Sequence, residues 1–493
     1  MFVRLDLLNR GALRRLMIGW AVTLAGLAGG AGAEPAVAYQ LRYDIAAADR
    51  VTVSLAPPQP MPAPLSLVAA RGYPGGYAQV PYDAFMSGVV ARAPDGSGLA
   101  VVKDADGPRW RLGRPGELVA SVDYDVDVAA MERGIHDAVA SSKLRNGYAG
   151  LLGYSIFAFL EGMEDRRIRL TIEAPDGWPA LTTLGPAVPP GFGRVTAEAA
   201  DFYQLADSQV LMGPALQITQ IDGKIPLVMA IYAEGEVDAT LEARLARHAL
   251  DCVQAYFGDT PFASYTVQLE LLRPLPDHAY GFSQEHIDSG SFSLSLEAAL
   301  TVHSTAAQRD RVEFNFAHHM AHSWIPKRAY GVGYRPFLWE MTPVIDSIWF
   351  NEGFGRYAAI AAMAAGLPQR ERDDYRQKQL AGLRAMLDAS PPFIRRMSLA
   401  TLSREASFLY GADFRTGRAI FARGALMAAE IDDRIRSRSG DAKSLRDAIQ
   451  GLLRWSAASG RAFNAEELPE IFKSATGVAV EDIIERWQQP LLQ

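Results

Sequence analysis

The sequence predicts an α+β protein in which an N-terminal β domain precedes a mixed and then mainly helical C-terminal part. Between about residues 36 and 200, apolar side chains alternate with polar or small ones, as in residues 118–128 and 168–172. A period of two, interrupted by Pro- and Gly-rich turns, is typical of half-buried antiparallel strands. After residue 305 the apolar side chains recur at the helical period, most clearly over residues 418–436.

The region between these two parts is mixed, with a helix expected near residues 241–257 and two strands after it. A Pro/Gly-rich stretch at residues 186–193 is the best candidate for a linker. We therefore expect the N-terminal β domain over residues 34–190 and a second domain over residues 191–493.

Residues 1–33 have the features of a secretory signal peptide. Four arginines precede an apolar run over residues 16–27, and Ala31-Gly32-Ala33 supplies the small residues that a signal peptidase accepts. The alternative is an uncleaved anchor, but this run is shorter than the roughly 20 residues that span a bilayer. We expect a periplasmic or secreted protein that contacts the membrane only through an uncleaved signal segment. Either the general or the twin-arginine route is compatible with Arg14-Arg15.

Composition excludes several classes of protein. The chain has 493 residues, of which 49% are hydrophobic, and a formal net charge of −7. So mild an acidic balance gives no reason to expect a nucleic acid as partner. Cys252 is the only cysteine, which excludes an intrachain disulfide and a cysteine-based zinc site.

The strongest chemical signal is a cluster of histidines. Three of the eight histidines in the chain, His318, His319 and His322, lie within five positions. Residues four apart share one face of a helix, so His318 and His322 can both reach one zinc ion. Glu352, near the start of another expected helix, would complete a His-His-Glu set with an open fourth position, as in catalytic zinc sites. Alternatively, both histidines are hydrogen-bonded core residues and Glu352 caps its helix.

Several segments resemble one family, the glycyl aminopeptidases among the gluzincin (thermolysin-like) zinc metallopeptidases. The segment HHMAHSWIPKR, residues 318–328, resembles the zinc-helix motif H-E-x-x-H-x-W-x-x-K-R, and WFNEGF, residues 349–354, resembles the helix of the third ligand. Further similar segments are the turn YPGGY at 73–77, the interdomain joint QLADS at 204–208 and the cleft strand GFSQEH at 281–286.

This resemblance implies a thermolysin-like catalytic domain over residues 191–493, with the metal helices at about 306–365. It implies zinc as cofactor, with His318, His322 and Glu352 as ligands. Peptide or protein N-termini would be the partners, and Glu285 would recognise their amine; otherwise Glu285 is a surface strand residue. Because the sequence ends soon after Glu352, we do not expect the PDZ module that many members carry.

Two positions depart from the family pattern. His319 stands where the family has the glutamate that acts as general base, and Phe421 stands where it has a tyrosine that stabilises the oxyanion. A positioned general base contributes about 10²–10⁴ in rate and one oxyanion donor about 10²–10³, and the two effects are not additive. His319 could itself act as the base, because imidazole exchanges protons near neutral pH. Otherwise it has no catalytic role.

Three functions therefore remain open from the sequence. The first is aminopeptidase-type peptide hydrolysis with altered or weakened catalysis. The second is a catalytically inactive homologue that binds zinc or a peptide terminus. The third is an inert scaffold of the cell envelope.

Overall fold

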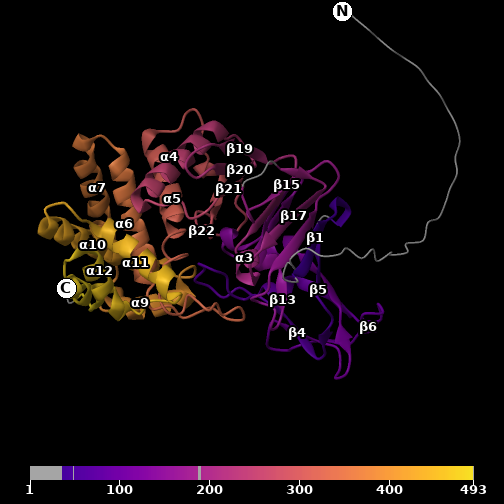
Figure 1. Cartoon of the computed structure of the whole chain (residues 1–493). Helices are drawn as coiled ribbons and strands as arrows, with labels where there is room; N and C mark the ends of the chain where they lie inside the picture. Colours follow the sequence, from indigo (N-terminus) through magenta and orange to yellow (C-terminus); the bar gives the residue numbers. More distant parts are fainter. Residues whose placement is uncertain (1–35, 48, 187–189, 492–493) are drawn as a thin grey trace, which may run out of the picture. The chain divides into compact units, whose positions relative to one another are not determined.

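The chain begins with strands and ends with helices, as the sequence predicts (Figure 1). The computed structural model describes residues 36–47, 49–186 and 190–491, so the predicted signal segment lies outside the described residues. Among the described residues, no helix combines the length and apolar character that a membrane crossing requires.

The N-terminal part contains three larger sheets around one core. The largest has the strand order β17-β14-β1-β2-β10-β5-β6. In β1 every second residue is buried, which is why the sequence alternates there. The strands of this sheet are β1 (Val37–Tyr43), β2 (Arg50–Ala56), β5 (Met86–Arg92), β6 (Gly98–Leu99), β10 (Ser121–Asp127), β14 (Ile168–Glu173) and β17 (Arg194–Ala199).

The two other sheets of this core have the orders β11-β12-β18-β15-β16 and β13-β4-β8-β7, and β3 pairs with β9. Their strands are β3 (Met61–Pro62), β4 (Leu65–Ala69), β7 (Val101–Lys103), β8 (Arg109–Leu112), β9 (Leu118–Val119), β11 (Lys143–Arg145), β12 (Tyr148–Leu152), β13 (Ala158–Leu160), β15 (Pro179–Thr182), β16 (Gly191–Phe192) and β18 (Gln209–Met212). Three short helices connect them: α1 (Val128–Gly134), α2 (Gly153–Ile156) and α3 (Phe202–Ala206).

The predicted domain boundary at residue 190 falls inside this β-rich part. The Pro/Gly-rich stretch at residues 186–193 includes β16, which pairs antiparallel with β15. Beyond it, β17 pairs with β14, and β18 pairs with both β12 and β15. Proline and glycine mark turns between paired strands as well as linkers, so the β-rich part continues to Met212.

A mixed five-stranded sheet, β19-β20-β21-β23-β22, opens the second part. Its neighbours β20, β21 and β23 run parallel and are buried along almost their whole length, as parallel strands covered on both faces are. The antiparallel edge strand β22 ends at Glu285. The bounds are β19 (Gln217–Ile221), β20 (Leu227–Ala233), β21 (Tyr265–Leu272), β22 (Ser283–Glu285) and β23 (Ser289–Ser295).

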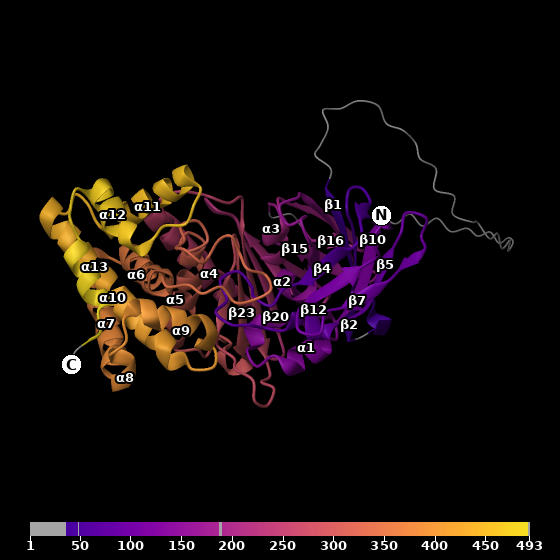
Figure 2. The ribbon, with the colours of Figure 1, turned by 90° about the horizontal axis from the view of Figure 1, so that it is seen from below.

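Helices complete the second part, and Figures 1 and 2 show α4 and α5 between the mixed sheet and the C-terminal helices. Helix α5 begins with a capping box in which Thr305 and Gln308 bind each other's backbone N–H. Helix α6 contacts α4, α5 and α10. The helices are α4 (Ala239–Phe257), α5 (Ala306–His322), α6 (Ile348–Gly366), α7 (Gln369–Asp388), α8 (Pro392–Arg395), α9 (Leu399–Leu409), α10 (Phe414–Ser439), α11 (Leu445–Ser459), α12 (Leu468–Thr476) and α13 (Glu481–Gln488).

A buried ion pair joins the two parts. Nζ of Lys327, just after α5, donates to Oδ1 of Asp207 at 2.9 Å and to the carbonyl of Pro74 at 3.0 Å. Asp207 also accepts the backbone N–H of Ile287 and lies 3.2 Å from Nδ1 of His286. Burial raises the pKa of Asp207, but Lys327 and His286 lower it more, so the carboxyl stays ionised.

We predict that Lys327→Met lowers the free energy of unfolding by about 3–5 kcal/mol, because it leaves a buried carboxylate without its cation. The neighbouring Arg328→Met is the control. Arg328 pairs with Asp259 on the surface, with side chains 36% and 45% exposed. Arg328→Met should therefore lower the free energy of unfolding by less than about 1 kcal/mol. Urea unfolding of both variants measures the difference. Equal losses would contradict a special role for the buried pair.

Candidate metal centre and its cavity

Two adjacent helices bring the three predicted metal-binding side chains together. His318 and His322 lie on the last turn and a half of α5, and Glu352 lies on α6. Nε2 of His322 is 3.2 Å from Nε2 of His318, and Oε2 of Glu352 is 3.5 Å from His322 and 3.7 Å from His318. All three side chains are buried.

The spacing of these three atoms fits a zinc ion. The point equidistant from them lies about 2.0 Å from each, and zinc binds histidine nitrogen and carboxylate oxygen at about 2.0–2.2 Å. Nδ1 of His322 is 2.8 Å from the carbonyl of Ile325, so the proton belongs on Nδ1 and the Nε2 lone pair faces the other two donors. Burial lowers the pKa of His318, which favours the neutral, ligand form.

Part of the alternative, a structural core, does not fit the geometry. Helix α6 has Ser347 as its N-cap, so Glu352 lies inside the helix and does not cap it. Nδ1 of His318 is buried without a hydrogen-bond partner among the described residues. A histidine retained for core packing would be expected to have its polar atoms satisfied.

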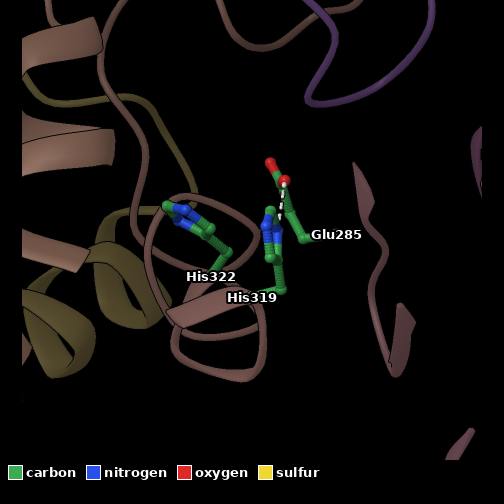
Figure 3. A group of neighbouring side chains, drawn as sticks. All are labelled: Glu285, His319 and His322. Carbon is green, nitrogen blue, oxygen red and sulfur yellow. Dashed lines mark ion pairs between the residues drawn. The ribbon is translucent and has the colours of Figure 1, made fainter. Parts of the chain in front are cut away.

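A second group of possible donors shares His322 with the first. It consists of Glu285 at the end of β22, His319 and His322, whose donor atoms lie within 4.8 Å of one another (Figure 3). Since Nδ1 of His322 faces the carbonyl of Ile325, both groups depend on its Nε2. One nitrogen lone pair binds one ion, so the two groups are alternative positions for a single metal and not a dinuclear site.

His319 faces Glu285 and not the first group. Its Nδ1 is 3.9 Å from Oε2 of Glu285, and Figure 3 shows the ring and the carboxylate facing each other. This distance is too long for a hydrogen bond. Accordingly, Nδ1 of His319 and Oε1 of Glu285 have no hydrogen-bond partner among the described residues. Burial lowers the pKa of His319, so a neutral imidazole is favoured.

Glu285 is buried at the wall of a cavity and is not a surface strand residue. The cavity has a volume of about 250 Å³. It is bounded by the turn at residues 75–78, by β22 and by α5, α6 and α10. Its polar and aromatic lining includes Tyr77, Glu285, His318, His319, Glu352, Arg356, Tyr410, Phe414 and Phe421.

Phe421 lies on α10 beside the metal group, with its ring centre 5.5 Å from that of His318. It contributes no hydroxyl, but Tyr410 also lines the cavity, 6.4 Å from Phe421 between ring centres. Sequence reasoning missed Tyr410, and no local pattern marks it. It also missed Arg356, although its position four residues after Glu352 places it on the same face of the helix.

Close helix packing makes room for the metal group. A Cβ atom on Gly353 would lie 2.3 Å from Cα of Gly424 on α10, so both residues must be small for α6 and α10 to approach. A Cβ atom on Gly355 would lie 2.9 Å from Cε1 of His322. Gly355 therefore leaves the space that the imidazole of His322 occupies.

Comparisons with known proteins agree with this architecture. Residues 38–214 match the family model of the Peptidase M61 N-terminal domain, and no curated protein sequence matches the chain. An aminopeptidase N family protein from Idiomarina loihiensis has a similar structure, with a TM-score of 0.79, 19% identity and coverage of 92% of this chain and 76% of that chain.

An M1 zinc metallopeptidase from Deinococcus radiodurans is also similar, with a TM-score of 0.53, 15% identity and coverage of 93% of this chain and 94% of that chain. A mutant of that enzyme bound to a Tyr-Ser-Ala substrate has a TM-score of 0.52 and 16% identity, with coverage of 93% of this chain and 95% of that chain. At these identities the likeness establishes the fold. It confirms the predicted α+β architecture, a β domain followed by a metallopeptidase-like domain with a helical C-terminal part.

We predict that Gly355→Ala lowers zinc affinity about 10- to 100-fold, because the added methyl group displaces the ring of His322. Competition with a chromophoric chelator measures the affinity. The control is Gly382→Ala on α7, where nothing lies within 4 Å of the added atom, so stability should rise slightly and affinity should not change. Unaltered affinity in the Gly355 variant would contradict the proposed place of His322.

Proposed function

We propose that this protein is an exported zinc-binding protein of the metallopeptidase type, with aminopeptidase-like recognition of peptide N-termini and weakened hydrolysis. The observation that carries the proposal is the set of three buried donor atoms about 2.0 Å from a common point. The metallopeptidase fold and the Peptidase M61 N-terminal domain support it. Export rests on the signal-like residues 1–33 alone.

In this proposal His318, His322 and Glu352 hold the zinc ion, which supplies Lewis-acid activation of water and of the scissile carbonyl. Glu285 binds the amine of the peptide, since its Oε1 is buried without a hydrogen-bond partner among the described residues and a carboxylate there pairs with an ammonium group. The cavity places the peptide bond beside the metal group.

Proton transfer is the weak step of this site. The glutamate that serves as base in the similar family is His319 here, a largely buried imidazole with a lowered pKa. A neutral imidazole can accept a proton, but the pKa shift makes it a poorer base. Phe421 offers no donor to the developing oxyanion, which leaves Tyr410 and Arg356 as the polar groups on that side of the cavity.

We predict that the zinc-loaded protein releases N-terminal amino acids slowly from unblocked peptides, and that His318→Ala abolishes this release. Amino-acid analysis of the products measures the rate. N-acetylated peptides are the matched control and should not be cleaved, because Glu285 then has no ammonium group to bind. Activity that survives a chelator and is unchanged in His318→Ala would rule out the metallopeptidase proposal.

A second candidate function is a non-catalytic protein that binds zinc or a peptide terminus. It is favoured by the pair His319 and Phe421, which removes the base and the oxyanion donor while the three metal donors and Glu285 remain. Substitution of the two positions separates the candidates, because Phe421 already lines the cavity and a tyrosine hydroxyl there would enter it.

We predict that His319→Glu with Phe421→Tyr raises peptidase activity by at least about 10²-fold, with the single variants giving smaller gains. Initial rates on one unblocked peptide, at equal zinc content, provide the measurement. If zinc is bound and no variant gains activity, the non-catalytic binding function is the correct one.

A further inference from the structure

Arg356 places a positive charge in the cavity wall. It lies one helical turn after Glu352 on α6 and lines the same cavity. The guanidinium carbon is 5.1 Å from the ring centre of Phe314 and 5.5 Å from that of Phe421. Arginine remains charged in proteins, so two aromatic faces hold a cation beside the metal group.

This cation has no anionic partner in the described part of the chain. Nε of Arg356 is buried without a hydrogen-bond partner. Burial lowers the pKa of Arg356, and Tyr410 and Glu352 offset this shift only in part. Glu352 forms no ion pair with Arg356, and its carboxylate belongs to the metal group. The two cation–π contacts offset only part of the cost of removing this charge from water. A largely buried guanidinium with free N–H groups is therefore ready to bind an anion.

The carboxylate of Glu285 provides the opposite charge in the same cavity. Its Oε1 is buried and also without a hydrogen-bond partner among the described residues. A cavity of about 250 Å³ is small beside the 300–1,000 Å³ of most ligand pockets. It thus offers a small ligand one free acidic group and one free basic group, with the metal donors beside both.

We propose that Arg356 binds the C-terminal carboxylate of a short peptide whose amine is held by Glu285, so that dipeptides and tripeptides with both ends free are the preferred ligands. The planar guanidinium binds a carboxylate through two parallel hydrogen bonds. This inference rests on the proposed recognition of the peptide amine by Glu285. It adds a determinant of substrate length, because a longer peptide cannot place its carboxylate in the cavity.

Calorimetric titration of the zinc-loaded protein with Ala-Ala and with Ala-Ala amide tests the proposal, with chromatography to confirm that the peptide is intact. For the natural sequence, we expect the amide to bind about 10- to 100-fold more weakly, the usual loss for a charge-assisted hydrogen bond. The Arg356→Gln variant should bind Ala-Ala as weakly as it binds Ala-Ala amide, and its affinity for the amide should equal that of the natural sequence. Arg356→Lys should restore part of the difference, since it keeps the charge without the planar fork.

Arg418→Gln is the matched control. Arg418 stacks on Phe414 with its guanidinium carbon 5.6 Å from the ring centre, but it is exposed and is not part of the cavity lining. Its variant should bind both peptides as the natural sequence does. Equal binding of acid and amide by the natural sequence would overturn the role of Arg356 and leave the proposed function standing. Equal weakening of both peptides in Arg356→Gln would also overturn it, because Arg356 would then contact a group common to both.

Failure of the proposed function has a different signature. If N-acetyl-Ala-Ala binds as tightly as Ala-Ala and Glu285→Gln changes neither, the amine is not recognised and both proposals fall. If Glu285→Gln weakens Ala-Ala while amidation has no effect, only the inference about Arg356 is wrong.

Discussion

The buried ion pair between Lys327 and Asp207 is the contact on which the geometry of the site depends. Lys327 follows the metal helix α5, and Asp207 follows the short helix α3 of the β-rich part. Asp207 also contacts His286 and Ile287, which directly follow Glu285 on the cavity wall. A charge removed from water needs partners in a defined geometry, so one carboxylate fixes both the metal helix and the strand end that carries Glu285. Its loss would remove the charged contact between these cavity walls.

The chemistry of the site is divided between donors that remain and groups that have changed. His318, His322 and Glu352 bring two imidazole nitrogens and a carboxylate oxygen to one point, a donor set that fits zinc. At position 319 an imidazole faces Glu285. A glutamate at this position would place a second negative charge beside the carboxylate of Glu285. In the proposed function, the residues at positions 319 and 421 would affect proton transfer and oxyanion stabilisation, whereas metal and ligand binding would depend on other side chains. Arg356 belongs with the binding groups, because its charge could bind an anion whether or not the site catalyses hydrolysis.

Local patterns in the sequence predicted what depends on local physics. Alternation predicted strands such as β10 and β14, the helical period predicted α10, and the four-residue spacing placed His318 and His322 on one face. The predicted boundary at residue 190 lies between paired strands of the β-rich part, because prolines and glycines mark hairpin connections as well as linkers. Asp207, Tyr410 and the pairing of His319 with Glu285 bring together segments far apart in the chain, and no local pattern contains that information. The place of Arg356 beside the metal group could have been predicted from the sequence, since it lies one helical turn from Glu352.

The metal content of the purified protein distinguishes the remaining possibilities most directly. Mass spectrometry of the metal ions should find one zinc ion per chain in the natural sequence and in His319→Ala. Zinc should be lost in Glu352→Gln and in His318→Ala, because each substitution removes a donor of the first group. Zinc that is lost in His319→Ala but retained in Glu352→Gln would place the metal in the alternative group of Glu285, His319 and His322. No stoichiometric zinc in the natural sequence would contradict the metal site altogether and favour an inert scaffold.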